Sequence, residues 1–307
     1  MPRLPYLALL ILLAPLASAA AQSSWRLERP IVAHQTGTFA DPRIGESSGV
    51  AASRRFPGVL WTHNDSGDRP YLFATDTSGA ALGTFSVTGA RNVDWEDIAL
   101  GPCGGATCLY IADTGDNNEG RRSVALYRVP EPDLRAHYPL RVRPTVAAQA
   151  VIFRYPDGPH DVEAMWVAPN EDVHLVAKGR MGRVRHYRVP RAGWPSSRPV
   201  VAEPLEPLPL FVRSELDRVT GAALSPDGQT VVVRTYSAAY FLFPTPNGRL
   251  RVPADPIACD VLALGLQGEG VSWLTDRWLV LTSERAILPA GTLAVAQCPL
   301  PQPVVGR

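Results

Sequence analysis

The stretch VDWEDIALG, residues 93–101, decides the fold, because its arrangement returns four more times along the chain. In it an oxygen-bearing side chain, Glu96, stands just before a short apolar run. Two further apolar runs follow, CLYIADTGD (108–116) and VALYRVP (124–130), and turn residues separate them. Consecutive short strands in a unit of roughly 40 to 70 residues are typical of one blade of a β-propeller.

The four other units begin at GESSGVAAS (45–53), HDVEAMWVA (160–168), RVTGAALSP (218–226) and QGEGVSWLT (267–275). The residues equivalent to Glu96 are Ser48, Glu163, Thr220 and Glu269. Each unit continues with at least two more candidate strands. The sequence therefore predicts an all-β, five-bladed β-propeller. A six-bladed ring is the alternative, because the second unit is long enough to hide a miscount.

The predicted blades cover about 45–90, 91–157, 158–212, 213–264 and 265–300. We place the fourth strand of blade three at RPVVAEPL (198–205). Blade five has three obvious strands, whereas the segment WRLERPIVAHQ (25–35) has no blade of its own. We expect 25–35 to complete blade five, because this pairing closes the ring and removes an open sheet edge.

Residues 1–21 have the features of a secretory signal peptide: Arg3, an apolar core from Leu7 to Leu16, and small residues up to Ala21. The apolar core is short for a membrane span. We therefore expect a periplasmic or secreted protein with one domain over 22–307 and no membrane insertion.

The four cysteines are an even number in a chain with an apparent leader, which favours disulfides. Cys103 and Cys108 flank a loop with two glycines that lets a small ring close, and Cys259 then pairs with Cys298 by elimination. Metal binding by the four thiols is the alternative, but their spacing does not form two CxxC pairs.

The chain carries 30 basic and 29 acidic residues. This balance argues against nucleic acid or an anionic membrane as the main partner. Near-zero net charge and strands without a long apolar patch are consistent with a monomer.

The five repeated oxygen-bearing residues are expected on the propeller axis, because the innermost strands of all blades face one channel. Three carboxylates in a narrow channel must be protonated, paired with cations or bound to a metal. Hard oxygen ligands suit Ca²⁺, and the lack of histidine disfavours zinc. The predicted Ca²⁺ ligands are Ser48, Glu96, Glu163, Thr220 and Glu269. Alternatively these residues only bind water in the channel, or the ion only braces the blades.

In these residues the chain resembles the calcium-dependent nucleotidases, or apyrases, which are secreted five-bladed propellers with one axial Ca²⁺. Their ligand order of hydroxyl, Glu, Glu, hydroxyl, Glu is similar to the order here, although Thr220 stands where the family has Ser. The phrases ESSGVA (46–51), DWEDIA (94–99), DVEAM (161–165) and SPDG (225–228) also resemble bacterial phytase-like or esterase-like propellers, most of them without an assigned function.

The ends of the second strands are expected near the channel mouth, where they could form a substrate site. Candidate catalytic residues are Asp65, His63 and Asp113. Candidate phosphate-binding residues are Lys178, Arg180, Arg234 and Arg285. The nucleotidase resemblance implies the same role for Asp65, Asp113, Lys178 and Arg234. The same NDSGD (64–68) and DTGDN (113–117) segments are also ordinary turn sequences.

Two functions remain open. In the first, the protein is a binding or scaffold module of the bacterial envelope or exterior with an axial Ca²⁺, whose partner is a phosphorylated small molecule or an envelope protein. In the second, it is a Ca²⁺-dependent phosphoanhydride or phosphoester hydrolase. The chain has no GxSxG elbow and no P-loop, so serine hydrolase and P-loop chemistry are disfavoured.

Overall fold

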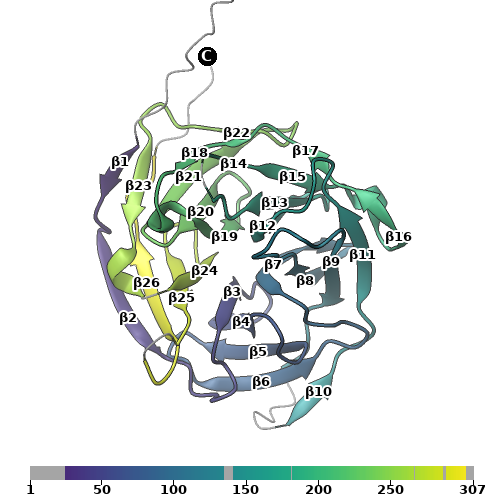
Figure 1. The fold of residues 1–307 in the computed structure, drawn as a ribbon. Helices are drawn as coiled ribbons and strands as arrows, with labels where there is room; N and C mark the ends of the chain where they lie inside the picture. Colours follow the sequence, from purple (N-terminus) through teal and green to yellow (C-terminus); the bar gives the residue numbers. More distant parts are fainter. Residues whose placement is uncertain (1–24, 135–140, 181, 266, 286–287, 302–307) are drawn as a thin grey trace, which may run out of the picture.

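A computed structural model describes residues 25–134, 141–180, 182–265, 267–285 and 288–301. The predicted leader over 1–21 lies outside these residues. Strands make up nearly all the regular structure, and five sheets form a ring around a central axis (Figure 1). This confirms the predicted all-β, five-bladed propeller.

Each blade is a meander of antiparallel strands whose first strand lies innermost. Blade one contains β3 (Ser47–Ala52), β4 (Val59–Asn64), β5 (Tyr71–Asp76) and β6 (Ala81–Ser86). Blade two contains β7 (Trp95–Cys103), β8 (Ala106–Asp113), β9 (Val124–Pro130) and β11 (Gln149–Arg154). Blade three contains β12 (Val162–Val167), β13 (Val173–Ala177), β15 (His186–Val189) and β17 (Glu203–Pro204), and it carries the separate pair β14 (Gly182–Val184) and β18 (Leu208–Val212).

Blade four contains β19 (Val219–Leu224), β20 (Val231–Thr235), β21 (Ala238–Pro244) and β23 (Ile257–Asp260), with β22 (Leu250–Arg251) paired to β21. Blade five contains β24 (Gly268–Trp273), β25 (Leu279–Ser283), β26 (Thr292–Gln297) and β2 (Val32–Thr38). The described part of the chain also contains single 3₁₀ turns at Arg191–Gly193, Glu215–Asp217 and Leu262–Leu264.

The N-terminal segment closes the ring as predicted, but it serves two blades. Strand β2 pairs antiparallel with β26 and supplies the outer strand of blade five. Strand β1 (Arg26–Glu28) instead pairs in parallel with β23 of blade four. Pro30 separates the two strands and cannot donate a ladder hydrogen bond, so the single strand expected over 25–35 is divided there.

Blade two also takes its outermost strand from the next repeat. Strand β16 (Ser196–Val201) pairs in parallel with β11 of blade two, and only β17 remains in blade three. The fourth strand that we placed at 198–205 is therefore divided between two blades. Pro199 lacks an N–H donor, which restricts this segment to a sheet edge. Strand β10 (Val142–Pro144) is added to β6 in the same way.

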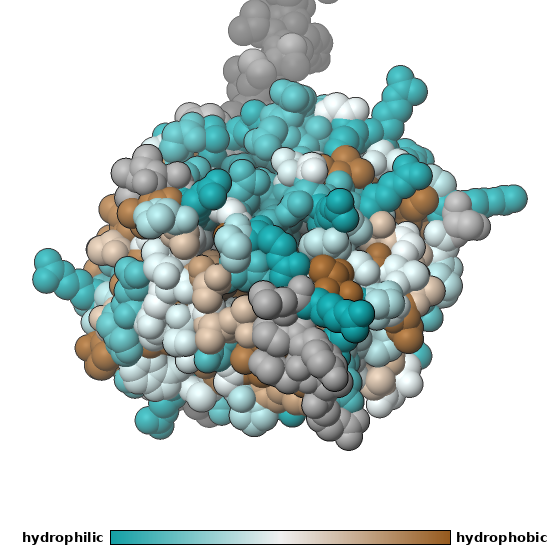
Figure 2. Space-filling model, turned by 90° about the horizontal axis from the view of Figure 1, so that it is seen from below, coloured by the Kyte–Doolittle hydropathy of each residue, from teal (hydrophilic) through white to brown (hydrophobic). Residues whose placement is uncertain are grey.

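The hydrophobic core lies between neighbouring sheets. One cluster joins blades two and three and another joins blades three and four, and the side chains of Trp61, Trp95, Trp166 and Trp273 are fully buried or nearly so. Figure 2 shows the side of the ring around β6 and β10, where hydrophobic side chains are scattered among hydrophilic ones. Among the described residues, no helix has the length and apolar character needed to cross a membrane.

The two predicted disulfides are present. Cys103–Cys108 closes the hairpin between β7 and β8, and Cys259–Cys298 joins β23 of blade four to the end of β26 in blade five. Two disulfides indicate that the chain folds in an oxidising compartment.

Removing Cys259–Cys298 is expected to cost more stability than removing Cys103–Cys108. The first disulfide closes a loop with a sequence separation of 39 and the second one of only 5. Loop entropy in the unfolded chain predicts a difference of about 2 kcal/mol in the free energy of unfolding. Denaturant unfolding of the two double Cys→Ala variants measures it. Equal losses would show that the loop-entropy account does not hold for this ring.

Candidate functional site

All five axial residues occupy the same place in their strands. Each is the second residue of an innermost strand, and each lies within a register shift between the first and second strands of its blade. A β-bulge changes the direction of a side chain that would otherwise alternate between the two faces of the sheet. The inner strands contact one another in the ring order β3, β7, β12, β19, β24 and back to β3, as the centre of Figure 1 shows. The five side chains are all buried: Ser48, Glu96, Glu163, Thr220 and Glu269.

The two axial hydroxyls connect neighbouring blades. Ser48 Oγ donates to the carbonyl oxygen of Glu96 at 2.8 Å and lies 3.2 Å from its Oε2. Thr220 Oγ1 donates to the carbonyl oxygens of Gly268 at 3.0 Å and Glu269 at 3.2 Å. Both hydroxyl protons are therefore directed at the next blade.

The closest carboxylates form two groups that share Glu96. The first group is Glu96, Asp161 and Glu163, and the second is Asp65, Asp94 and Glu96. Within each group one ligand oxygen per residue lies within 4.8 Å of the others. Asp94 and Asp161 stand two residues before an axial position, and our predicted ligand set omitted them. The period of two along a strand could have identified them, because residues i and i−2 face the same side.

The first group already has a cationic partner. Lys178, directly after β13, places Nζ 2.6 Å from Glu163 Oε1 and 3.8 Å from Asp161 Oδ2. It is the only lysine in the whole sequence. Burial alone would lower the pKa of Lys178, but attraction to Glu163 and Asp161 outweighs burial and raises it. Burial raises the pKa of Glu163 to about 7 despite the nearby ammonium group.

The second group forms no ion pair among the described residues, although Lys178 acts to lower the pKa of Asp65 and Arg121 that of Asp94. Burial, followed by repulsion from Asp65, raises the pKa of Asp94 to about 7. The Arg121 guanidinium group, which acts to lower the pKa of Asp94, forms its ion pair with Asp113 at 2.8 Å. Burial also raises the pKa of Asp65. Three acidic side chains thus converge with no ion pair to any of them among the described residues.

The backbone passes close to this second group. A methyl group added to Gly115 would collide with Glu96 Oε1 and come within 2.6 Å of Asp94 Cγ. The turn after β8 therefore approaches the carboxylates closely only because residue 115 is glycine. On the opposite side of the axis, the buried Glu269 Oε2 has no hydrogen-bond partner among the described residues. Repulsion from Glu163 adds to burial in raising the pKa of Glu269, which places these two carboxylates near each other.

The predicted catalytic residues lie in different surroundings. Asp65 belongs to the second acid group. Asp113 is buried, accepts a hydrogen bond from the Asp94 N–H and pairs with Arg121. His63 is fully buried with its ring edge-on to Trp95, and burial lowers its pKa to about 4. The structure thus brings both Asp65 and Asp113 close to Asp94, while His63 packs in the core.

The four predicted phosphate-binding residues do not surround one rim. Lys178 bonds to the hub acids. Arg234 is fully buried, and its Nη1 donates to the carbonyl oxygens of Gly270 at 2.6 Å and Thr282 at 2.8 Å. Arg180 is bonded to the carbonyl oxygen of Asn117 and pairs with Glu119. Arg285 is exposed.

One buried acid that sequence analysis did not single out closes the channel. Asp97 Oδ2 accepts the N–H of Met165 at 2.7 Å and that of Ala222 at 3.3 Å, while Oδ1 accepts the N–H of Ile98 at 2.8 Å. These donors belong to blades three, four and two. The equivalent positions in the other blades carry small residues: Gly49, Ala164, Gly221 and Gly270. Asp97 fills the space that they leave, so the two channel mouths are separate.

No family model and no curated protein matches this chain. Among solved structures, the PQQ-bound form of aldose sugar dehydrogenase from Streptomyces coelicolor is similar over 88% of this chain and 99% of its own, with 11% identity and a TM-score of 0.47. A putative 6-phosphogluconolactonase from Bacteroides uniformis is similar over 90% of this chain and 80% of its own, with 13% identity and a TM-score of 0.40. The strand topology itself defines the class: a disulfide-bonded five-bladed propeller with an acidic hub.

Proposed function

We propose that this protein is an exported binding or scaffold propeller that holds Ca²⁺ at the acidic mouth of its channel. One observation carries the proposal: Asp65, Asp94 and Glu96 converge, and none of the three forms an ion pair among the described residues. Ionised carboxylates at such distances repel one another, and a divalent cation removes the repulsion. The disulfides and the leader-like segment over 1–21 support export.

The donor set suits Ca²⁺ better than other common metals. It contains only oxygen atoms, and Ca²⁺ takes six to eight of these with flexible geometry. Asp65 and Asp94 are half-buried, so water or an oxygen atom of a partner could complete the coordination. The unpartnered Glu269 Oε2 is a further buried oxygen that faces the same hub. When bound, the ion would supply a positive charge that recognises an anionic or oxygen-rich partner, such as a phosphorylated molecule or an envelope protein.

This ligand set differs from the one that the sequence predicted. Glu96 belongs to both the predicted and the proposed ligand sets. The proposed set adds Asp65 and Asp94. Glu163 is less suitable because the Lys178 ammonium group lies 2.6 Å from its Oε1. Ser48 and Thr220 serve the hub by bonding to the carbonyl oxygens of the next blade.

Hydrolysis of a phosphoanhydride or phosphoester, the other predicted function, finds less support in these contacts. It would need cationic side chains that are free to hold a phosphate group. Lys178 and Arg234 are committed to hub acids and backbone carbonyls, and Arg180 bonds to the turn that contains Asn117. We therefore favour a binding function.

Thermal unfolding in Ca²⁺ and in a chelator tests the proposal. A ligand at a hundred times its Kd adds about 2.7 kcal/mol to the free energy of unfolding. For a domain of this size that corresponds to a rise of about 5 °C in the melting temperature. Elemental analysis of the purified protein should find about one calcium per chain. A melting temperature indifferent to Ca²⁺ and to the chelator would refute the site, and NaCl at equal ionic strength controls for screening.

A further inference from the structure

The channel has a second mouth, on the face opposite the acidic hub, and a cavity of about 480 Å³ lies there. It is bounded by the C-terminal halves of all five innermost strands, with small or apolar side chains such as Val50, Ala99, Trp166, Ala222 and Ser272. Small-molecule sites typically enclose about 300 to 1,000 Å³ and are mostly apolar with few polar groups. This far-face cavity has the size and lining of such a site.

The far-face cavity is isolated from the acidic mouth. Asp97 lies between the two, and both its carboxylate oxygens accept backbone N–H groups. A methyl group on Gly49 would meet the Ile98 nitrogen at 2.8 Å, and one on Gly270 would meet the Val50 nitrogen at 2.7 Å. The inner strands therefore touch backbone to backbone in the middle of the channel. A ligand in the cavity would not contact a cation at the hub.

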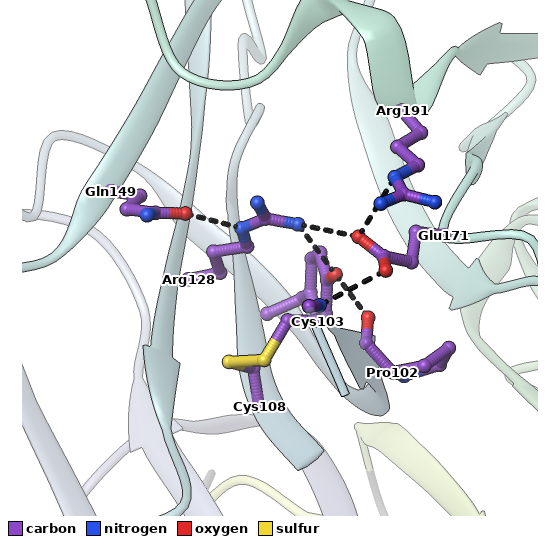
Figure 3. The surroundings of a disulfide bond; sticks show 9 residues. Pro102, Cys103, Cys108, Arg128, Gln149, Glu171 and Arg191 are labelled. Atoms are coloured by element: carbon purple, nitrogen blue, oxygen red, sulfur yellow. Dashed lines mark hydrogen bonds and ion pairs between the residues drawn. A yellow bond between two sulfur atoms is a disulfide. The ribbon is translucent and has the colours of Figure 1, made fainter. Parts of the chain in front are cut away.

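Contacts away from the hub hold one wall of the cavity rigid. The hairpin between β7 and β8 contributes Gly101, Pro102, Ala106 and Thr107 to the lining. The Cys103–Cys108 disulfide cross-links the two strands of this hairpin (Figure 3). The N–H of Gly104 donates to Glu171 Oε1 at 3.0 Å, which ties the hairpin to blade three.

Glu171 is itself fixed from two sides. Figure 3 shows Arg128 and Arg191 converging on its carboxylate, at 3.2 Å and 3.5 Å. Arg128 also donates to Tyr110 Oη at 3.0 Å, and that hydroxyl donates to the carbonyl oxygen of Pro102 at 2.6 Å. A wall fixed before binding loses little conformational entropy when a ligand arrives.

The charged side chains at the rim of the cavity indicate the charge of a suitable ligand. Arg54 is the one cationic side chain in the cavity lining, and it has no hydrogen bond or ion pair among the described residues. The acid of the lining, Asp227, already accepts hydrogen bonds from Ser225 Oγ at 2.5 Å and from the N–H of Gln229 at 3.0 Å. The exposed carboxylate of Asp276 attracts the Arg54 guanidinium group but forms no ion pair with it. The rim therefore offers one cationic side chain that no carboxylate contacts directly, above an apolar floor.

We propose that the far-face cavity binds a small amphipathic carboxylate, whose apolar body lies on the floor and whose anionic group pairs with Arg54. A guanidinium group binds a carboxylate in bidentate geometry, which gives the complex both affinity and orientation. The site is independent of the cation that we propose for the hub.

Calorimetric titration with octanoate, and with 1-octanol as its neutral counterpart, tests this proposal. The intact protein is expected to take up one octanoate per chain, in Ca²⁺ and in EDTA alike. Arg54→Met keeps the length of the side chain and removes its charge. It should weaken octanoate binding by about tenfold or more and leave 1-octanol binding unchanged. Ala106→Phe, at the exposed start of β8, should weaken the binding of both by filling the cavity.

Arg277→Met is the matched control, because Arg277 is exposed and does not line the cavity. It should bind octanoate as the unmodified protein does. Absence of saturable octanoate binding at millimolar concentration, or equal affinities for Arg54→Met and the unmodified protein, would overturn the proposal. So would a dimer that Ala106→Phe dissociates and octanoate does not, because a second copy of the chain would then occupy the cavity.

Discussion

Replacing Glu96 with glutamine is expected to abolish the Ca²⁺-dependent rise in melting temperature. Glu96 belongs to both carboxylate groups of the hub, so its charge contributes wherever a cation binds there. The charge of the ligands sets the affinity of calcium sites over several orders of magnitude. We expect the Kd for Ca²⁺ to rise by about a hundredfold or more.

The same substitution should make the calcium-free protein more stable. Burial and then repulsion from Glu163 raise the pKa of Glu96 well above its ordinary value, so its charged form is unfavourable in the folded hub. The neutral amide keeps an oxygen that can accept the hydrogen bond from Ser48 Oγ. We expect a gain of about 1 kcal/mol, or a melting temperature about 2 °C higher. Calorimetry in EDTA measures this gain.

Glu284→Gln is the matched control for Glu96→Gln. Burial and then repulsion from Asp65 raise the pKa of Glu284 to about 7, so this carboxyl senses the charge of the hub, yet Glu284 belongs to neither carboxylate group. Its variant should keep the response to Ca²⁺. If Glu96→Gln responds to Ca²⁺ like the unmodified protein, the ion does not lie at the hub.

The number of blades could be predicted because each repeat carries its own local pattern. The axial residue, the apolar run after it and the turn before the next strand all lie within one blade. Axial positions such as Glu96 and Glu269 could therefore be aligned without knowledge of the packing. The closing strand could be identified as well, since blade five has three obvious strands and residues 25–35 had no partner of their own.

The exchange of strands between blades could not be predicted in this way. Strand β16 lies between β15 and β17 of blade three in the sequence but pairs with β11 of blade two. Its apolar pattern fits either edge, and only the packing of the finished ring distinguishes them. The same holds for β1, which comes just before β2 in the sequence but pairs with β23 of blade four and not with blade five.

The electrostatics of the hub also depend on contacts across the axis. The sequence places Lys178 at the end of a strand and predicts a free ammonium group there, which could hold a phosphate group. In the structure its ammonium group bonds to Glu163, 15 residues earlier in the chain. A residue that the sequence places at the rim thus neutralises part of the hub, and for this reason the cation site that we propose lies near Asp65 and Asp94 rather than on Glu163.

Replacing Asp97 with alanine is expected to cause the largest loss of stability. Asp97 Oδ2 accepts the N–H groups of Met165 and Ala222, which join blade two to blades three and four through the middle of the channel. All three residues are fully buried or nearly so. Each buried donor left without a partner costs about 1 to 3 kcal/mol, so the free energy of unfolding should fall by about 4 kcal/mol. Guanidinium unfolding, monitored by tryptophan fluorescence, measures the loss.

Two further variants separate this role from a general effect of removing a carboxylate. Asp97→Asn keeps one acceptor oxygen, but its amide group places an N–H donor opposite a backbone N–H. Because one acceptor remains, we expect Asp97→Asn to lose less stability than Asp97→Ala. Asp276→Ala removes an exposed carboxylate at the far face and should change stability by less than about 0.5 kcal/mol. If Asp97→Ala unfolds at the same denaturant concentration as Asp276→Ala, the backbone groups of the channel must find other partners. Asp97 would then not be what holds the three blades together at the axis.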